Sequence, residues 1–155
     1  MGNEKVRIFL DSNVIISGLF SDRGAPRVIL DLLSLRLPVL SGVTGQFNIV
    51  EIERNLKKKM PEVLPRYREY LPLLNLEIIP LPAAREIAEL KGRVAEKDLP
   101  VLASAMRAKA DFLVTGDRKD FAKARRMRKD PPRVVSPAEL LEMVLPEILR
   151  LLEER

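Results

Sequence analysis

The stretch VRIFLDSN, from Val6 to Asn13, joins a mostly apolar run to a polar group. An apolar run of five residues predicts a buried strand, and Asp-Ser-Asn favours turns and helix caps. A second stretch of the same kind, DFLVTGD, extends from Asp111 to Asp117. We therefore expect two strands whose carboxyl ends are each followed by an acidic residue.

Around these two strands, the apolar pattern predicts strands that alternate with helices. The expected strands are residues 6–10, 38–41, 76–79, 111–115 and 133–135, and the expected helices are residues 24–35, 44–60, 61–74, 83–94 and 97–109. A last helix opens at Ser136 with a capping box to Glu139, and Pro146 is expected to kink or break it. Beyond it, an apolar stripe of Leu145, Ile148, Leu149 and Leu152 is expected to pack on the same chain or on a second copy.

Strands that alternate with helices imply parallel pairing and right-handed crossovers. We therefore expect an α/β fold, a three-layer α/β/α sandwich with a central parallel sheet of four to five strands. Residues 1–155 are expected to form a single domain with a C-terminal helical extension at about 137–155. In such sheets, sites form beyond the carboxyl ends of the strands.

The composition excludes several classes of chemistry. The 155 residues include no cysteine and no histidine, so zinc fingers, cysteine nucleophiles and Ser-His-Asp triads are excluded. No apolar stretch approaches the roughly 18 residues of a membrane span, and no apolar segment follows the first basic residues. We expect a cytoplasmic protein that does not enter a membrane.

Acidic residues gather at the expected sheet edge. Asp11 and Asp117 follow two strands, Asp98 lies near the start of a helix, and Glu51 and Glu53 lie in the helix of residues 44–60. Two like charges about 4 Å apart cost about 4 kcal/mol at an effective dielectric constant of 20, so a cation has to offset them. An all-oxygen site without histidine or cysteine selects Mg²⁺ or Mn²⁺.

The positive charge is concentrated in one segment. Residues 118–133 hold eight basic and two acidic residues, while the rest of the chain is close to neutral and the whole chain has a net charge of +5. Such a segment favours a polyanionic partner, and the alternative is a solvated loop. The residues predicted to bind this partner are Arg118, Lys119, Arg125, Arg126 and Arg128.

Two motifs resemble those of PIN-domain nucleases, in particular the compact prokaryotic members that include the VapC-like toxin ribonucleases of toxin–antitoxin pairs. The first is residues 9–15, FLDSNVI, and the second joins residues 98–105, DLPVLASA, to residues 110–117, ADFLVTGD. The resemblance implies a ribonuclease with four acidic residues that hold Mg²⁺ or Mn²⁺. It also implies RNA as substrate, an antitoxin protein as a partner, and a homodimer.

By position in this family, the resemblance assigns catalytic roles to Asp11, Glu51, Asp98 and Asp117, with Asp11, Asp98 and Asp117 as metal ligands. Asn13 and Thr115 would orient the carboxylates. Glu51 fits the family pattern better, whereas helical geometry places Glu53 nearer the apolar stripe, so that choice stays open. Asp120 is either a further ligand or a turn cap.

Other classes of protein fit the sequence less well. A phosphoaspartyl receiver needs an acidic residue after its third strand, where Pro80 stands, and a haloacid-type phosphatase needs a second Asp at the position of Asn13. A non-catalytic RNA-binding or scaffold PIN domain is the stronger alternative. Because Asp11, Asp98 and Asp117 are all present, catalysis is the preferred prediction.

Overall fold

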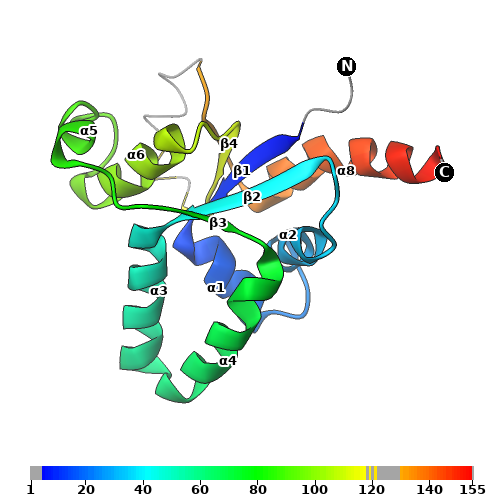
Figure 1. The fold of residues 1–155 in the computed structure, drawn as a ribbon, viewed down its shortest axis with the longest axis horizontal. Helices are drawn as coiled ribbons and strands as arrows, with labels where there is room; N and C mark the ends of the chain where they lie inside the picture. The colour runs from blue at the N-terminus through cyan, green and yellow to red at the C-terminus, as the bar shows by residue number, and fades with distance from the viewer. Residues whose placement is uncertain (1–4, 118, 120, 122–129, 155) are drawn as a thin grey trace.

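The structure is a computed structural model that describes residues 5–117, 119, 121 and 130–154. Its centre is a sheet of five parallel strands in the order β3-β2-β1-β4-β5 (Figure 1). The strands are β1 (Val6–Leu10), β2 (Leu40–Gly45), β3 (Glu77–Ile79), β4 (Phe112–Val114) and β5 (Arg133–Val135). The sequence therefore predicted the parallel sheet correctly.

Helices cover both faces of this sheet. The α-helices are α1 (Ser12–Phe20), α2 (Ala25–Ser34), α3 (Gln46–Lys59), α4 (Leu64–Tyr70), α5 (Ala84–Ala88), α6 (Leu99–Arg107) and α8 (Pro137–Glu153), and the 3-10 helices are η1 (Pro61–Val63), η2 (Leu71–Leu74) and η3 (Glu96–Asp98). One buried cluster joins the sheet to α1, α2, α3 and α8, and a second joins it to α6. This arrangement confirms the three-layer α/β/α sandwich.

The central strand shows why the sequence has an uninterrupted apolar run there. In β1, Ile8 and Leu10 pack in the first cluster, and Phe9 packs in the second. All three side chains are fully buried. Successive side chains of a strand point to opposite faces, so a strand covered on both faces is apolar throughout.

Several predicted element boundaries were wrong. Strand β2 occupies Leu40–Gly45 and not residues 38–41, because Thr44 and Gly45 still pair with β3 and delay the start of α3 to Gln46. Residues 61–74 form three short helical segments, each with a proline in its first turn, instead of one return helix. The helix predicted at 83–94 ends at Ala88, before a turn in which Gly92 has a φ of 90°.

The last helix differs from expectation at Pro146. The capping box is present: Glu139 N–H donates to Ser136 Oγ at 3.1 Å, and Ser136 N–H donates to Glu139 Oε1 at 2.8 Å. However, α8 continues through Pro146, which lies on its exposed side, where water can satisfy the carbonyl that proline leaves without a partner. Ile148 is buried in the core of the same chain, whereas Leu149 and Leu152 are more than half exposed. The apolar stripe is therefore divided between the core and the surface.

Candidate active site

The carboxyl ends of β1 and β4 meet at one edge of the sheet. Leu10 pairs with Val114 across the two strands, and Asp11 N–H donates to Val114 O at 3.0 Å. This register places Asp11 opposite Thr115, the first residue after β4. Asp11 is also the N-cap residue of α1, so its backbone is held by both the sheet and the helix.

The Asp11 carboxylate accepts hydrogen bonds on both of its oxygens. Oδ1 accepts from Ser12 N–H at 2.8 Å and from Asn48 Nδ2 at 3.2 Å. Oδ2 accepts from Thr115 Oγ1 at 2.9 Å and from Asn13 Nδ2 at 3.4 Å. With only 7% of the residue exposed, four donors determine the orientation of this carboxylate.

Two of these donors also hold the loop after β4. Asn13 Oδ1 accepts from Gly116 N–H at 2.9 Å, and Thr115 Oγ1 accepts from Asp117 N–H at 3.1 Å. Asn13 and Thr115, the residues predicted to orient carboxylates, therefore connect Asp11 to the backbone of Gly116 and Asp117. Their hydrogen bonds place Asp117 on the same side of the sheet as Asp11.

A cavity of about 240 Å³ lies above this edge, and we call it the acidic cavity. Four acidic residues line it, each from a different segment: Asp11 after β1, Glu51 from α3, Asp98 from η3 and Asp117 from the loop after β4. The other lining residues are Ser12, Asn13, Ile16, Asn55, Lys97 and Val101. The structure therefore brings the four predicted catalytic acids to one cavity.

The carboxylates in the acidic cavity affect one another electrostatically. Burial is the main cause that raises the pKa of Asp11 above its ordinary value; hydrogen bonds from Thr115 and Ser12 oppose this rise, and the charges of Glu51 and Asp117 add to it. Among the described residues, no three acidic side chains converge closely enough to form a metal-binding cluster. The acids share a cavity without forming a closed cage.

Glu53 lies outside the acidic cavity. Its Oε1 accepts from Arg68 Nη2 at 2.7 Å and from Arg68 Nε at 3.0 Å. On an α-helix, residues two positions apart point in directions that differ by about 200°. The geometry therefore separates the two glutamates: Glu51 faces the cavity and Glu53 faces α4.

Sequence reasoning missed Asn48, which is fully buried and donates to both Asp11 Oδ1 and Ser12 Oγ. A signal was present, because Asn48 lies one helical turn before Ile52 on the buried face of α3, where a polar side chain needs a partner. Gly45 makes room for it, since a Cβ on Gly45 would lie 2.9 Å from Asn48 Oδ1. Asn55 and Lys97 were also missed.

Most of the predicted RNA-binding segment lies outside the described residues. This applies to Arg118, Arg125, Arg126 and Arg128, and also to Asp120. Lys119 is described and is exposed, two residues after Asp117. The RNA-binding role of the segment therefore stays a prediction from charge.

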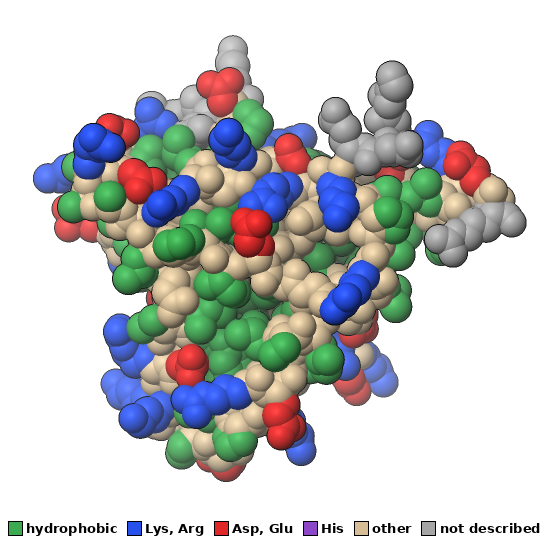
Figure 2. All heavy atoms as spheres, in the orientation of Figure 1, with side chains coloured by type: hydrophobic (Ala, Val, Ile, Leu, Met, Phe, Trp, Pro, Cys, Tyr) green, Lys and Arg blue, Asp and Glu red, His purple; other side chains and the backbone are tan. Residues whose placement is uncertain are grey.

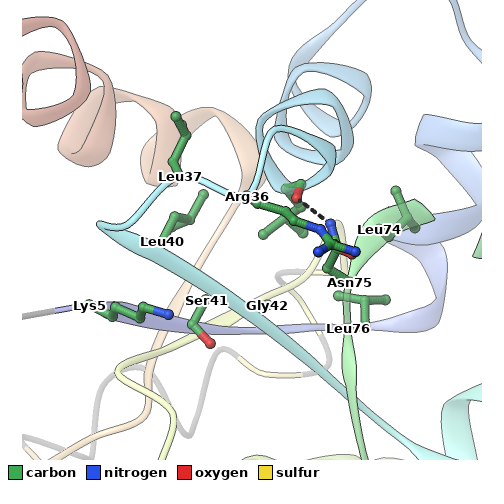
Figure 3. Close-up of a pocket in the computed structure, with 10 residues that line it drawn as sticks. Lys5, Arg36, Leu37, Leu40, Ser41, Gly42, Leu74, Asn75 and Leu76 are labelled. Atoms are coloured by element: carbon green, nitrogen blue, oxygen red, sulfur yellow. Dashed lines mark hydrogen bonds between the residues drawn. The ribbon is translucent and has the colours of Figure 1, made fainter. Parts of the chain in front are cut away.

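A second cavity, of about 500 Å³, lies at the other edge of the sheet, near the start of β2 (Figure 3). Lys5 and Arg36 are its charged lining residues, and Asn75 joins Arg36 to α2 by accepting from Arg36 Nε at 3.0 Å and donating to Leu33 O at 3.2 Å. Among the described residues that line it there is no carboxylate. The acidic cavity is the better candidate for catalysis.

Comparison with protein families agrees with this geometry. The sequence profile of the PIN domain matches residues 7–119, which include all four acids of the acidic cavity. The chain belongs to the PIN domain family. The resemblance seen in the two sequence motifs is thus confirmed. A comparison with curated protein sequences found no match.

Solved structures share the fold of this PIN domain. VapBC2 from Rickettsia felis, bound to a DNA fragment from its promoter, matches with a TM-score of 0.62 and 18% identity over 84% of this chain and 98% of the other. A toxin–antitoxin complex from Klebsiella pneumoniae matches with a TM-score of 0.57 and 24% identity over 84% of this chain and 97% of the other. VapBC-1 from nontypeable Haemophilus influenzae matches with a TM-score of 0.58 and 16% identity over 85% of this chain and 98% of the other. At these identities the likeness establishes the fold.

Proposed function

We propose that this PIN domain is a metal-dependent endoribonuclease that hydrolyses phosphodiester bonds of RNA. The observation that carries the proposal is the acidic cavity, which four carboxylates from four separate segments line, the buried Asp11 among them. Folding brings these charges together at an electrostatic cost. A cluster of this kind at the end of a parallel sheet is typical of a functional site.

The residues of the acidic cavity fit a hard divalent cation. Their donors are carboxylate oxygens, which suit Mg²⁺ and Mn²⁺. Burial, with a smaller contribution from the charges of Glu51 and Asp117, raises the pKa of Asp11 above its ordinary value. A cation beside these carboxylates would offset their mutual repulsion, which supports the assignment. We assign Asp11, Asp98 and Asp117 as the metal ligands and Glu51 as the fourth catalytic acid. When bound, the ion supplies Lewis acidity toward the phosphate.

The remaining polar residues position these groups. Asn13 and Thr115 hold the Asp11 carboxylate in one orientation through the hydrogen bonds described above. Lys97 is the one basic side chain among the described residues that line the acidic cavity. We assign Lys97 to contact a phosphate of the substrate, because its positive charge beside the acidic residues attracts the polyanionic RNA chain toward the cavity.

The basic segment supplies sequence-independent affinity for the RNA backbone. Replacing Arg125, Arg126 and Arg128 together with Gln is expected to weaken RNA binding about tenfold at low salt. It should also reduce the slope of log affinity against log salt concentration by about 2, since each lost phosphate contact on a single strand contributes about 0.7. Binding measured by fluorescence anisotropy from 50 to 300 mM KCl checks this. An unchanged slope would refute the role of the segment.

We further propose that the chain is the toxin of a toxin–antitoxin pair with an antitoxin protein as its partner. Two of the structural neighbours are VapBC proteins, and a third is described as a toxin–antitoxin complex. Figure 2 shows hydrophobic side chains in a hollow between α3 and α4, a surface suited to an apolar protein segment. The exposed Leu149 and Leu152 of α8 are assigned to a homodimer contact.

A scaffold PIN domain that binds RNA without cutting it is the second candidate. It is favoured by one observation: in the described part of the chain, the acids do not form a preassembled metal cluster. The two candidates predict different results when a divalent metal ion is added to the protein with bound RNA: the ribonuclease cleaves the RNA, and the scaffold leaves it intact.

A cleavage assay with the full chain tests the proposal. Labelled single-stranded RNA, structured RNA and single-stranded DNA are incubated with the protein in Mg²⁺, in Mn²⁺ or in EDTA. We expect internal cuts in RNA with either metal and none in EDTA. RNA binding with no cleavage under any condition would favour the scaffold, and cutting restricted to DNA would overturn the assignment of RNA as substrate.

A further inference from the structure

One face of α3 extends beyond the acidic cavity. Glu51 and Asn55 line the cavity from this helix, and α3 continues to Lys59. An α-helix turns by about 100° per residue, so Arg54 and Lys58 point within about 60° and 20° of the direction of Glu51. We call these two residues the α3 ridge. The helix therefore presents positive charge on the face that carries Glu51 into the cavity.

The two cations of the α3 ridge are available to an external anion. Both side chains are exposed, and neither forms a salt bridge within the part of the chain that the structure describes. Arg54 and Lys58 lie four residues apart, a spacing at which like charges destabilise a helix. The helix dipole favours lysines in the last turn, which accounts for Lys58 but not for Arg54 in the turn before. A bound anion would offset the repulsion between the two.

The adjacent Lys57 belongs to another face of α3. It lies about 120° from the direction of Glu51 and about 40° from that of Glu53, and Glu53 faces α4 through its ion pair with Arg68. Glu53 and Lys57 also have the four-residue spacing at which a glutamate before a lysine stabilises a helix. Lys57 therefore has a structural explanation within α3 that Lys58 lacks.

The α3 ridge is close enough to the acidic cavity for one RNA strand to reach both. The helix rises by about 10 Å from Glu51 to Lys58, which corresponds to about three nucleotides of a stacked strand. Figure 2 shows Lys and Arg side chains gathered at the end of α3 and the start of α4, where the helical hairpin turns. A polyanion that leaves the cavity along α3 therefore meets positive charge.

We propose that the α3 ridge binds phosphates of the RNA strand on one side of the scissile phosphate. This inference rests on the proposed function, which supplies RNA as the ligand and the acidic cavity as the place of cleavage. The predicted basic segment begins after Asp117, in a different segment of the cavity lining. The α3 ridge is therefore a second set of phosphate contacts, which positions the strand without reading its bases.

A comparison of Lys58→Glu with Lys57→Glu tests the ridge. Both substitutions reverse one exposed charge in the last turn of α3, and the helix dipole opposes both alike. Lys58→Glu is expected to weaken binding of a labelled single-stranded RNA about tenfold at low salt. It should also lower the slope of log affinity against log salt concentration by about 0.7, the contribution of one phosphate contact, whereas Lys57→Glu should change affinity less than about twofold. Fluorescence anisotropy in EDTA measures both without requiring cleavage.

Arg54→Gln combined with Lys58→Gln is a second variant, which adds no negative charge to the helix. It should lower the same slope by about 1.4, for two lost contacts, and raise KM for cleavage with little change in kcat. Equal RNA affinity of the Lys57→Glu and Lys58→Glu proteins would mean that the ridge is a solvated face only, and would overturn it. A difference between these two proteins, with no cleavage by the unmodified chain in Mg²⁺ or Mn²⁺, would instead overturn the proposed function and leave the ridge standing.

Discussion

Asp11→Asn is expected to lower the rate of metal-dependent RNA cleavage by about 1,000-fold. The substitution removes the central charge of the acidic cavity while keeping the size of the side chain. A bound metal ion contributes several kcal/mol to the stabilisation of charge in the transition state, and each 1.36 kcal/mol corresponds to a factor of ten in rate. The loss of one ligand and its charge therefore accounts for about three orders of magnitude. Single-turnover cleavage with saturating protein measures it.

Asp111→Asn is the matched control for this prediction. Asp111 immediately precedes β4 at the opposite edge of the sheet, is exposed, and accepts from Arg7 N–H at 2.8 Å through Oδ2. Its replacement removes the same charge from the chain and should leave cleavage close to that of the unmodified protein. Cleavage by Asp11→Asn at the same rate as by Asp111→Asn would exclude Asp11 from the reaction.

The strands and the sheet edge could be predicted because their signals are local. The apolar run of β1 reflects burial on both faces, and a parallel sheet brings the ends of its strands to one edge. For this reason Asp11 and Asp117, more than 100 residues apart, could be placed together from the sequence. In the structure both residues line the acidic cavity, while their catalytic roles stay predictions.

The remaining errors come from tertiary contacts that a local pattern does not contain. The helical periodicity of α3 could not show which of Glu51 and Glu53 faces the acidic cavity. The answer depends on Arg68 in α4, which binds Glu53. Asn48 has no charge and no motif, and its function as a donor to Asp11 follows only from the packing of α3 against the start of α1. The late start of α3 likewise follows from the pairing of Thr44 with β3.

Glu51→Gln is expected to lower cleavage about 100-fold at a fixed low metal concentration, the upper end of the effect of removing a group that supports a metal site. Glu51 lines the acidic cavity, and its negative charge acts on Asp11. The same substitution at Glu53 is the matched control, because Glu53 pairs with an Arg68 side chain that is 61% exposed. An exposed ion pair contributes at most about 1 kcal/mol to stability. Glu53→Gln should therefore keep full cleavage with a slightly lower melting temperature.

The metal dependence of the Glu51→Gln protein distinguishes two functions of this carboxylate. If Glu51 helps to hold the cation, the Mn²⁺ concentration for half-maximal cleavage rises, and saturating Mn²⁺ restores most of the rate. If Glu51 acts on the attacking water instead, the half-maximal concentration stays the same and excess Mn²⁺ restores nothing. Full cleavage by Glu51→Gln at low metal, or a loss in Glu53→Gln of the same size, would contradict the assignment of Glu51. Both substitutions remove one charge from the same helix. A loss of cleavage in Glu51→Gln alone is therefore due to the position of Glu51 at the acidic cavity and not to the change in net charge.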